Sequence, residues 1–218
     1  MKKLILSCLT LMLSMSAYAD NPLYETGPGQ DSSFVRFLNA GNEKVSVVNG
    51  KAKVGLGTQN DARVSRFYPV KAGDKLSATV QLGNLKTTVD VVAKPGEFIT
   101  VAIVSKANTL ESVIVREAPT DFNAMRSSVS LMNIDASCAN AGLTGGAKEA
   151  MIFENIKPGT TARRLINPVS LSVKAHCGGE PAGAAVDMQQ LQAGERYSVI
   201  LIPAKKGRQV FFVRDSTS

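Results

Sequence analysis

An internal repeat is the feature that most constrains how this chain of 218 residues can fold. Three short segments recur in the second half of the sequence, in the same order and shifted by 94 or 98 positions. The matched pairs are Val35–Asn39 with Val129–Asn133, Pro95–Val101 with Ala193–Val199, and Val115–Glu117 with Val213–Asp215. An ordered match at nearly constant spacing predicts two copies of one structural unit.

Each copy of the repeat has the pattern of a series of short β-strands. Gly, Pro, Asn and Asp interrupt the chain at short intervals, and the runs between them alternate apolar and polar residues or are almost continuously apolar. The expected strands are Phe34–Asn39, Val45–Val48, Lys75–Leu82, Thr87–Val92, Phe98–Val104, Glu111–Arg116, Ser128–Asn133, Ala150–Phe153, Val169–Ala175, Tyr197–Ile202 and Gln209–Arg214. We also expect a loop at Gly142–Gly146 and a short helix at Asp187–Gln192.

A unit of about 90 residues with six or seven short strands has the size of an Ig-like sandwich. The sequence therefore predicts an all-β fold with two tandem Ig-like β-sandwich domains related by internal duplication. The almost continuously apolar runs Ile99–Val104 and Val199–Ile202 suit strands in the middle of a sandwich. A linker is expected near Ala118–Asp121, because Pro119 interrupts strand pairing.

The beginning of the chain has the pattern of a secretory signal peptide. Lys2 and Lys3 precede an apolar run at Leu4–Ser16, and Ala17 and Ala19 supply the small residues of a cleavage site. An uncleaved membrane anchor is the alternative, but the run is shorter than the roughly 20 apolar residues that a membrane span needs. We therefore expect export to the periplasm, with a signal peptide at 1–19, an N-terminal β-sandwich domain at 20–118, a linker at 119–127 and a C-terminal β-sandwich domain at 128–218.

Removal of the signal peptide would take Cys8 away and leave Cys138 and Cys177. An even number of cysteines in an exported chain predicts a disulfide between them. The alternative is a reactive thiol at Cys177 beside His176. Neighbouring residues of a strand point to opposite faces, so these two side chains would not readily form a nucleophile–base pair.

The sequence offers few candidates for catalysis or for holding a cofactor. His176 is the one histidine of the chain, which argues against a histidine-rich metal site and against most Ser-His-Asp arrangements. A Gly-x-Ser-x-Gly motif and a phosphate-binding Gly-rich loop are both absent from the sequence. We therefore expect a protein that is not an enzyme and that has no cofactor and no metal.

Basic residues are better candidates for binding. They cluster at Arg163 and Arg164, and again at Lys205, Lys206 and Arg208, where we expect a hairpin tip. Arginine and lysine are natural partners of the carboxylates of a polyuronate, so these residues are candidate contacts for a polymer or a protein partner. The alternative is that the charged hairpin tip is only a solvated turn and has no binding role. Without the signal peptide the formal net charge falls from +7 to +5, and export disfavours nucleic acid as a partner.

Five segments of the expected mature chain resemble a known family: Leu23-Tyr24, Gly27-Pro28, Asp31–Ala40, Arg164–Val169 and Leu191–Tyr197. They are similar to segments of the AlgF family, which are periplasmic proteins of alginate O-acetylation. The resemblance extends over essentially the whole expected mature chain. It has no counterpart at Ser137–Lys148 and Cys177–Ala185, which hold the cysteine pair and the Gly-rich loops.

The resemblance implies a role and not a reaction. AlgF-like proteins work beside a membrane-bound O-acyltransferase and SGNH-type periplasmic acetyltransferases, and related systems acetylate cellulose. We therefore expect a non-catalytic periplasmic accessory protein for O-acetylation of an exopolysaccharide, which binds acetyltransferase partners and an anionic polysaccharide. Two alternatives stay open: an Ig-like envelope chaperone or structural subunit with a free strand edge, and an acetyltransferase or acetylesterase that pairs a Ser or Cys with His176.

Overall fold

The computed structural model of the chain describes residues 32–106, 108–119 and 123–217. The expected signal peptide and the Leu23-Tyr24 and Gly27-Pro28 segments lie outside these residues. The described residues form β-strands and one short 3-10 turn, η1 (Asp61–Arg63). Among them, no helix is long and apolar enough to cross a membrane.

The N-terminal unit is a sandwich of two four-stranded sheets. Its strands are β1 (Ser32–Asn39), β2 (Val45–Asn49), β3 (Ala52–Leu56), β4 (Tyr68–Lys71), β5 (Lys75–Leu82), β6 (Leu85–Val92), β7 (Phe98–Lys106) and β8 (Thr109–Glu117). One sheet has the order β4-β1-β7-β8 and the other has the order β3-β2-β5-β6. Apolar residues from both sheets, among them Val35, Val80 and Val101, form a buried core between them.

The C-terminal unit is a second sandwich, reached through the segment between Glu117 and Ser127. Its strands are β9 (Ser127–Asn133), β10 (Ala141–Gly145), β11 (Ala150–Ile156), β12 (Thr160–Ile166), β13 (Ser170–Cys177), β14 (Glu180–Pro181), β15 (Val186–Gln190), β16 (Arg196–Pro203) and β17 (Arg208–Arg214). One sheet has the order β12-β9-β16-β17, and the other has the order β11-β10-β13-β14 with β15 also paired to β13. The exact domain boundaries expected from the sequence remain predictions.

The two units are built alike. In the N-terminal unit, Val35 of β1 lies opposite Ile99 of the parallel strand β7. In the C-terminal unit, Val129 of β9 lies opposite Tyr197 of the parallel strand β16. These are the positions that the repeat pairs at offsets of 94 and 98. The prediction of an all-β fold with two tandem Ig-like sandwiches related by duplication is confirmed.

Equivalent asparagines end the first strand of each unit. The Nδ2 group of Asn39 donates to two backbone carbonyl oxygens, both at 2.7 Å. The Nδ2 group of Asn133 likewise donates to two backbone carbonyl oxygens, at 2.8 and 3.0 Å. Both side chains are fully buried. Each asparagine therefore holds two other segments of its own sandwich together.

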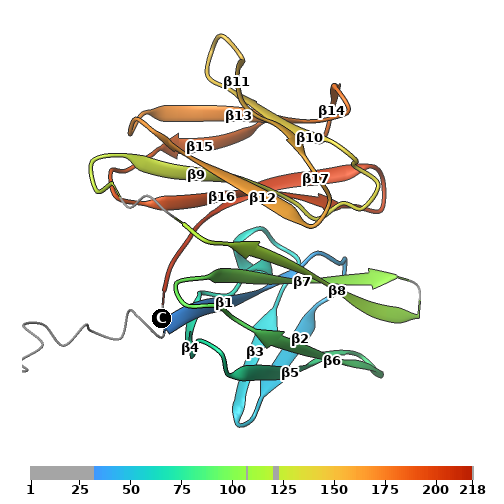
Figure 1. Cartoon of the computed structure of the whole chain (residues 1–218). Coiled ribbons are helices and arrows are strands. Elements are labelled where there is room, and N and C mark those ends of the chain that lie inside the picture. The colour runs from blue at the N-terminus through green and yellow to red at the C-terminus, as the bar shows by residue number, and fades with distance from the viewer. Residues whose placement is uncertain (1–31, 107, 120–122, 218) are drawn as a thin grey trace, which may run out of the picture.

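The two sandwiches stack face to face, so that four sheets lie one above another (Figure 1). The sheet β4-β1-β7-β8 meets the sheet β12-β9-β16-β17, and we call this contact the seam. Its apolar residues include Leu38, Ala102, Val115, Met132, Ile200 and Phe211. Both sheets are thus covered on both faces, once by the partner sheet of their own unit and once by the other unit. This double burial explains the almost continuously apolar runs at Ile99–Val104 and Val199–Ile202.

The expected loop at Gly142–Gly146 is wrong, because this segment contains β10, which pairs on both sides with β11 and β13. Its glycines fit places of close approach. A Cβ atom on Gly142 would lie 3.3 Å from the carbonyl oxygen of Phe153, and one on Gly145 would lie 2.5 Å from Cδ1 of Ile152. Glycine in a strand often marks such a site of close approach, and in the sequence alone it has the same pattern as a loop.

The expected helix at Asp187–Gln192 is also wrong, because most of this segment belongs to the edge strand β15. Met188 is buried between the exposed neighbours Asp187 and Gln189. This alternation has the period of a strand and not of a helix. The strand pairs with β13, and its positive φ of 59° at Gln189 accompanies an irregular register.

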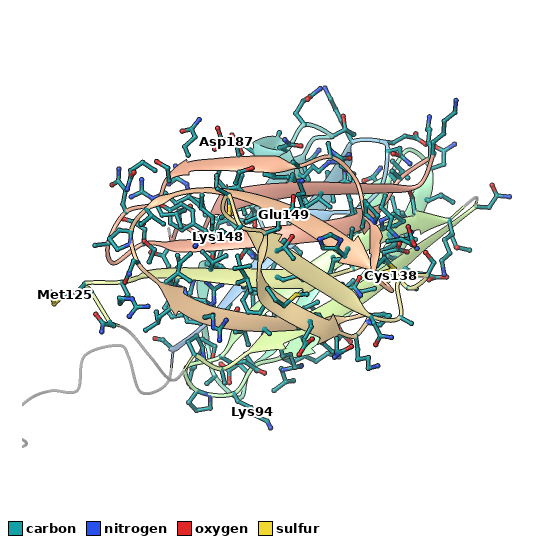
Figure 2. The ribbon with its side chains drawn as sticks, turned by 90° about the horizontal axis from the view of Figure 1, so that it is seen from above. Lys94, Met125, Cys138, Lys148, Glu149 and Asp187 are labelled. Carbon is teal, nitrogen blue, oxygen red and sulfur yellow. A yellow bond between two sulfur atoms is a disulfide. The ribbon has the colours of Figure 1, made fainter. Side chains whose placement is uncertain are left out.

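The expected disulfide between Cys138 and Cys177 is present, with the two Cα atoms 5.5 Å apart. Cys138 lies in the connection between β9 and β10, and Cys177 ends β13, so the bridge joins this connection to β13. Figure 2 shows Cys138 and the exposed Met125 toward opposite ends of this unit. A disulfide of this kind indicates an oxidising compartment.

Candidate binding site at the seam

A buried ion pair joins the two units inside the seam. Arg36 of β1 is 2% exposed, and its Nη1 donates to Oδ1 of Asp215 at 2.7 Å. Its Nε donates to the hydroxyl of Thr100 at 2.9 Å, and its Nη2 donates to the hydroxyl of Ser198 at 3.0 Å. The Ser198 hydroxyl also donates to Asp215 at 2.8 Å. An arginine of the N-terminal unit is thus held by a carboxylate and a hydroxyl of the C-terminal unit.

A reciprocal contact joins Glu117 of β8 to two arginines of the C-terminal unit. Arg163 of β12 donates through Nε to Oε1 of Glu117 and through Nη2 to Oε2 at 3.2 Å. Arg196 of β16 donates to Oε1 of the same carboxylate at 2.7 Å. Arg163 also reaches Oδ2 of Asp215 at 3.0 Å, which links this contact to the first one. The charged residues form one network across the seam.

The network is built from equivalent positions of the repeat that carry different residues. Arg36 lies opposite Thr100 in the pair β1–β7, and Ser130 lies opposite Ser198 in the pair β9–β16. Small hydroxyl groups in the second copy therefore face the large guanidinium group of the first. If both copies had arginine at the position of Arg36 and Ser130, two positive charges would meet in the seam. The replacement of arginine by serine in the second copy therefore favours contact between the N-terminal and the C-terminal unit.

Aromatic rings cover the guanidinium groups of the network. Arg36 lies 4.4 Å from the ring centroid of Phe67, and Arg196 lies 4.8 Å from that of Phe98. The Phe98 ring stacks on that of Phe34 at 4.7 Å and meets that of Phe67 edge-on at 5.1 Å. These cation–π contacts stabilise arginines that burial has removed from water.

The network keeps the carboxylate of Asp215 ionised. Burial alone would raise the pKa of Asp215, but the charges of Arg36 and Arg163 and the hydrogen bond from Ser198 hold this pKa below its ordinary value. Burial, with the nearby charge of Arg163, lowers the pKa of the Arg196 guanidinium, while the neighbouring carboxylates oppose this shift. Asp215 is therefore negatively charged at neutral pH. Arg36 and Arg163 depend on this charge, because it compensates their own buried positive charges.

The residues after β17 cross from the C-terminal unit to the N-terminal unit. The backbone N–H of Phe67 donates to the carbonyl oxygen of Ser216 at 2.8 Å, and Thr217 pairs with Phe67 as an isolated parallel bridge. Figure 1 shows this segment running down beside the start of β1. We call Asp215–Thr217 the clasp, because its backbone and its carboxylate both bind the N-terminal unit.

Two open grooves border the network, at opposite edges of the seam. The first has a volume of about 420 Å³ and lies where β8 passes β12, and the second has a volume of about 540 Å³ and lies where β17 passes the segment before β4. Three arginines and one acidic residue contribute to the lining of each groove: Arg116, Arg163, Arg164 and Glu117 in the first, and Arg36, Arg66, Arg214 and Asp61 in the second. Both units contribute to both grooves, so neither groove would exist in a single sandwich.

Of the basic residues predicted to bind, Arg163 is engaged inside the seam. Its guanidinium is occupied by Glu117 and Asp215, and only 12% of its side chain is exposed. Arg164 is exposed and contributes to the first groove, with one long hydrogen bond to the carbonyl oxygen of Ile152 at 3.4 Å. The structure brings these two residues to the same groove but leaves only Arg164 open to a ligand.

The other predicted residues lie at the tip between β16 and β17, which is a hairpin as expected. Lys205 and Lys206 are exposed there. Arg208 donates through Nε to Oδ2 of Asp135 at 2.7 Å and through Nη2 to the hydroxyl of Ser137 at 3.2 Å. The hairpin tip is separate from the two grooves, and a binding role for it remains a prediction.

His176 contacts Thr144, a residue that the sequence analysis did not single out. The Nε2 atom of His176 lies 3.0 Å from the Thr144 hydroxyl, on neighbouring strands β13 and β10. The nearby carboxylate of Glu149 forms an ion pair with Lys174. Among the described residues, no group of three or more His, Cys, Asp or Glu side chains could hold a metal ion.

Comparison with known proteins finds only distant similarity. No model of a protein family matches the chain, and no curated protein matches it. Among solved structures, a "putative cell adhesion protein" from Bacteroides uniformis is 10% identical and covers 88% of this chain and 99% of its own, with a TM-score of 0.29. A protein of the same description from Bacteroides ovatus is 8% identical and covers 86% of this chain and 98% of its own, with a TM-score of 0.28. Matches this distant carry no information about function.

Three arginines meet in the second groove, and the sequence alone did not indicate any of them as a binding residue. Arg36 stands alone between apolar residues of an expected strand, and this was the available signal for a buried partner. Arg66 and Arg214 are single basic residues without a neighbour of the same charge, so a search for clusters passes over them. Only the stacking of the two sheets brings Arg36, Arg66 and Arg214 to one groove.

Proposed function

We propose that this protein is a non-catalytic accessory protein for O-acetylation of an exopolysaccharide. It would be exported to the periplasm by a signal peptide that is then cleaved. It would hold a membrane-bound O-acyltransferase and SGNH-type acetyltransferases close to an anionic polymer such as alginate, or to cellulose in a related system. The observation that carries the proposal is the seam, where a buried charge network fixes two sandwiches and leaves an arginine-lined groove at each edge.

The arrangement fits a protein that positions other molecules. A preorganised surface binds with a smaller entropy cost than one that must order itself on binding. The buried network and the clasp supply such a fixed surface, since they connect the two units through side chains and through backbone. The resemblance of the sequence to the AlgF family directs the proposal to O-acetylation and adds the acetyltransferases as partners.

The proposal is tested by capturing the protein from envelope extracts with an antibody raised against the purified chain. We expect a membrane-bound O-acyltransferase or an SGNH-type acetyltransferase in the captured material. Deletion of the gene should lower the acetyl content of the polymer, and the intact gene should restore it. Capture of no such enzyme together with an unchanged acetyl content would refute the proposal. Capture of a polymerising subunit bound along a strand edge would favour the chaperone alternative.

The non-catalytic part of the proposal needs a separate assay. Purified protein should not hydrolyse an acetyl ester or transfer its acetyl group, and His176→Ala and Thr144→Val should leave the background rate unchanged. These two variants are matched, since each removes one side of the same hydrogen bond. Turnover that disappears in both variants would show that the pair acts as nucleophile and base, and would overturn this part of the proposal.

A further inference from the structure

An apolar cavity opens between the two sheets of the N-terminal sandwich, at a place that is separate from the seam. It has a volume of about 200 Å³ and lies where the edge strands β3 and β4 face each other. Its lining is mostly apolar and includes Val35, Val54, Val70 and Leu76. We call this cavity the notch, because it gives access from the side to the core of the sandwich.

The internal repeat shows how the notch comes to be open in the first unit. The edge strand β4 pairs with Ser32–Val35 of β1, whereas the corresponding edge strand β12 pairs with all seven residues of β9. β4 also contains Pro69, which has no backbone N–H to donate. Phe37 lies beyond the part of β1 that pairs with β4, and it contributes to the lining of the notch. The shortened edge strand leaves part of the core accessible.

Both strands beside the notch have an unpaired side. β3 and β4 each stand at the end of a sheet order, so each pairs with a single neighbour within the part of the chain that the structure describes. Unpaired strand edges attract other chains, and proteins commonly cover them with a further segment. A segment that covers this place would run along β3 and β4 and would insert an apolar side chain between them.

Lysines surround the mouth of the notch. Lys51 and Lys53 flank Ala52, which contributes to the lining, and Lys71 ends β4. All three lysines are exposed. Lys51 and Lys53 form no ion pair with any described residue, and Nζ of Lys71 lies 3.9 Å from Oδ2 of Asp74. The notch therefore favours a segment that has acidic residues close to its apolar side chain.

The residues before β1 have this chemistry. The segment 20–31 lies outside the described residues and continues directly into β1 at Ser32. It contains three acidic residues, Asp20, Glu25 and Asp31, and no lysine or arginine. Its aliphatic side chain is that of Leu23. The segment is thus complementary to the notch both in charge and in its apolar residue.

The same segment is also long enough to reach the notch. Ser32 lies opposite Lys71, and the next pair along the two strands joins Ser33 to Val70 of the notch. The nine residues from Leu23 to Ser32 can span up to about 30 Å when extended. Gly27-Pro28-Gly29 lies between them and has the composition of a chain reversal. Leu23 can therefore return to the notch without any change in the sandwich.

We infer that the notch binds residues 20–31 of the same chain, with the side chain of Leu23 inserted between β3 and β4. An apolar cavity of about 150 Å³ accepts benzene, so the notch has room for one leucine side chain. The bound segment closes the opening to the core and keeps β3 and β4 from pairing with another chain. This inference is independent of the proposed function, because it concerns how the first sandwich covers its own edge.

The test measures access to the notch in the full mature chain, residues 20–218. Ala52→Cys places a thiol at the mouth of the notch, and iodoacetamide, which is uncharged, measures how fast this thiol reacts. Leu23→Ser in the same background should raise the rate roughly tenfold, because burial of a leucine side chain favours the bound state by at least that factor. Tyr24→Ala should leave the rate unchanged, since neighbouring residues of an extended segment point to opposite sides.

Val92→Cys is the matched control site. Val92 is 49% exposed on β6, which is the opposite edge of the sheet that contains β3. Its reaction rate should be the same with and without Leu23→Ser, and mass spectrometry assigns the label to the new cysteine in each case. Equal rates at Ala52→Cys with and without Leu23→Ser would overturn the inference. A rate at Ala52→Cys that falls as the protein concentration rises would show that a second copy fills the notch, and would overturn binding within one chain.

Discussion

Arg36 and Asp215 are 179 positions apart in the sequence and meet at 2.7 Å inside the seam, each almost completely buried. One belongs to the first strand of the first sandwich, and the other follows the last strand of the second. Their contact makes the N-terminal sandwich depend on the C-terminal one, because the carboxylate that neutralises the buried Arg36 belongs to the other unit.

Asp215→Asn should destabilise the whole chain. Arg36 and Arg163 would lose a carboxylate while they remain buried, and removal of one partner from a buried ion pair costs about 3–5 kcal/mol. Urea denaturation followed by circular dichroism should show the fall in the free energy of unfolding. Arg214→Gln changes the adjacent, exposed residue and should unfold close to the wild type. An Asp215→Asn curve that superimposes on the wild-type curve would contradict the network.

The stability of the wild-type chain should fall in acid because of Asp215. The pKa of this carboxyl is lowered in the folded protein, against an unfolded value of about 3.9. Its stabilising contribution is therefore fully present above about pH 4 and is lost as the pH falls through the folded-state pKa. Urea titrations at a series of pH values should show a steeper acid loss for the wild type than for Asp215→Asn. Parallel pH profiles for the two proteins would argue against a depressed pKa.

Loss of the disulfide should lower stability without changing the fold. The bridge closes a loop with a sequence separation of 39, which corresponds to about 4 kcal/mol on the chain-entropy model. Cys138→Ser, Cys177→Ser and reduction of the wild type should all lower the melting temperature. A reducing agent should have no effect on the double Ser variant. Alkylation of unfolded, unreduced protein should label neither cysteine, and labelling of both would refute the bridge.

Asn39→Ala and Asn133→Ala should have similar effects, because the repeat gives the two residues the same role. Each change removes two hydrogen bonds to backbone carbonyl groups from a fully buried position and should cost about 1–3 kcal/mol. Chemical denaturation measures the loss. Asn49→Ala, at an exposed position at the end of β2, is the control and should be close to neutral. A loss confined to one of the two repeats would show that they are not equivalent.

Strands with a clear local pattern could be predicted from the sequence. The expected run Lys75–Leu82 coincides with β5, where the apolar positions alternate with polar ones. β12 was missed, because Arg163 and Arg164 stand in the middle of its seven residues. A charge inside a strand can be understood only from its partner, and Glu117 lies 46 positions away in the other unit. Local patterns contain no information about such a contact.

The candidate site was only partly predictable for the same reason. The basic cluster directed attention to Arg163 and Arg164 as binding residues, which stays a prediction, and it could not show that Arg163 is occupied by carboxylates. The second groove combines Arg36, Arg66 and Arg214, which are far apart in the sequence. Their proximity depends on how the two sandwiches stack. The repeat predicted that there would be two units, but it did not specify which faces would meet.

The clasp has a consequence for a chain that is cut directly after β17. Asp215, Ser216 and Thr217 follow every described strand of both units, so such a chain would keep all of these strands and lose the clasp. Arg36 would then lose the carboxylate that neutralises it inside the seam. A cut at this position should therefore weaken the contact between the two sandwiches without removing a strand from either one.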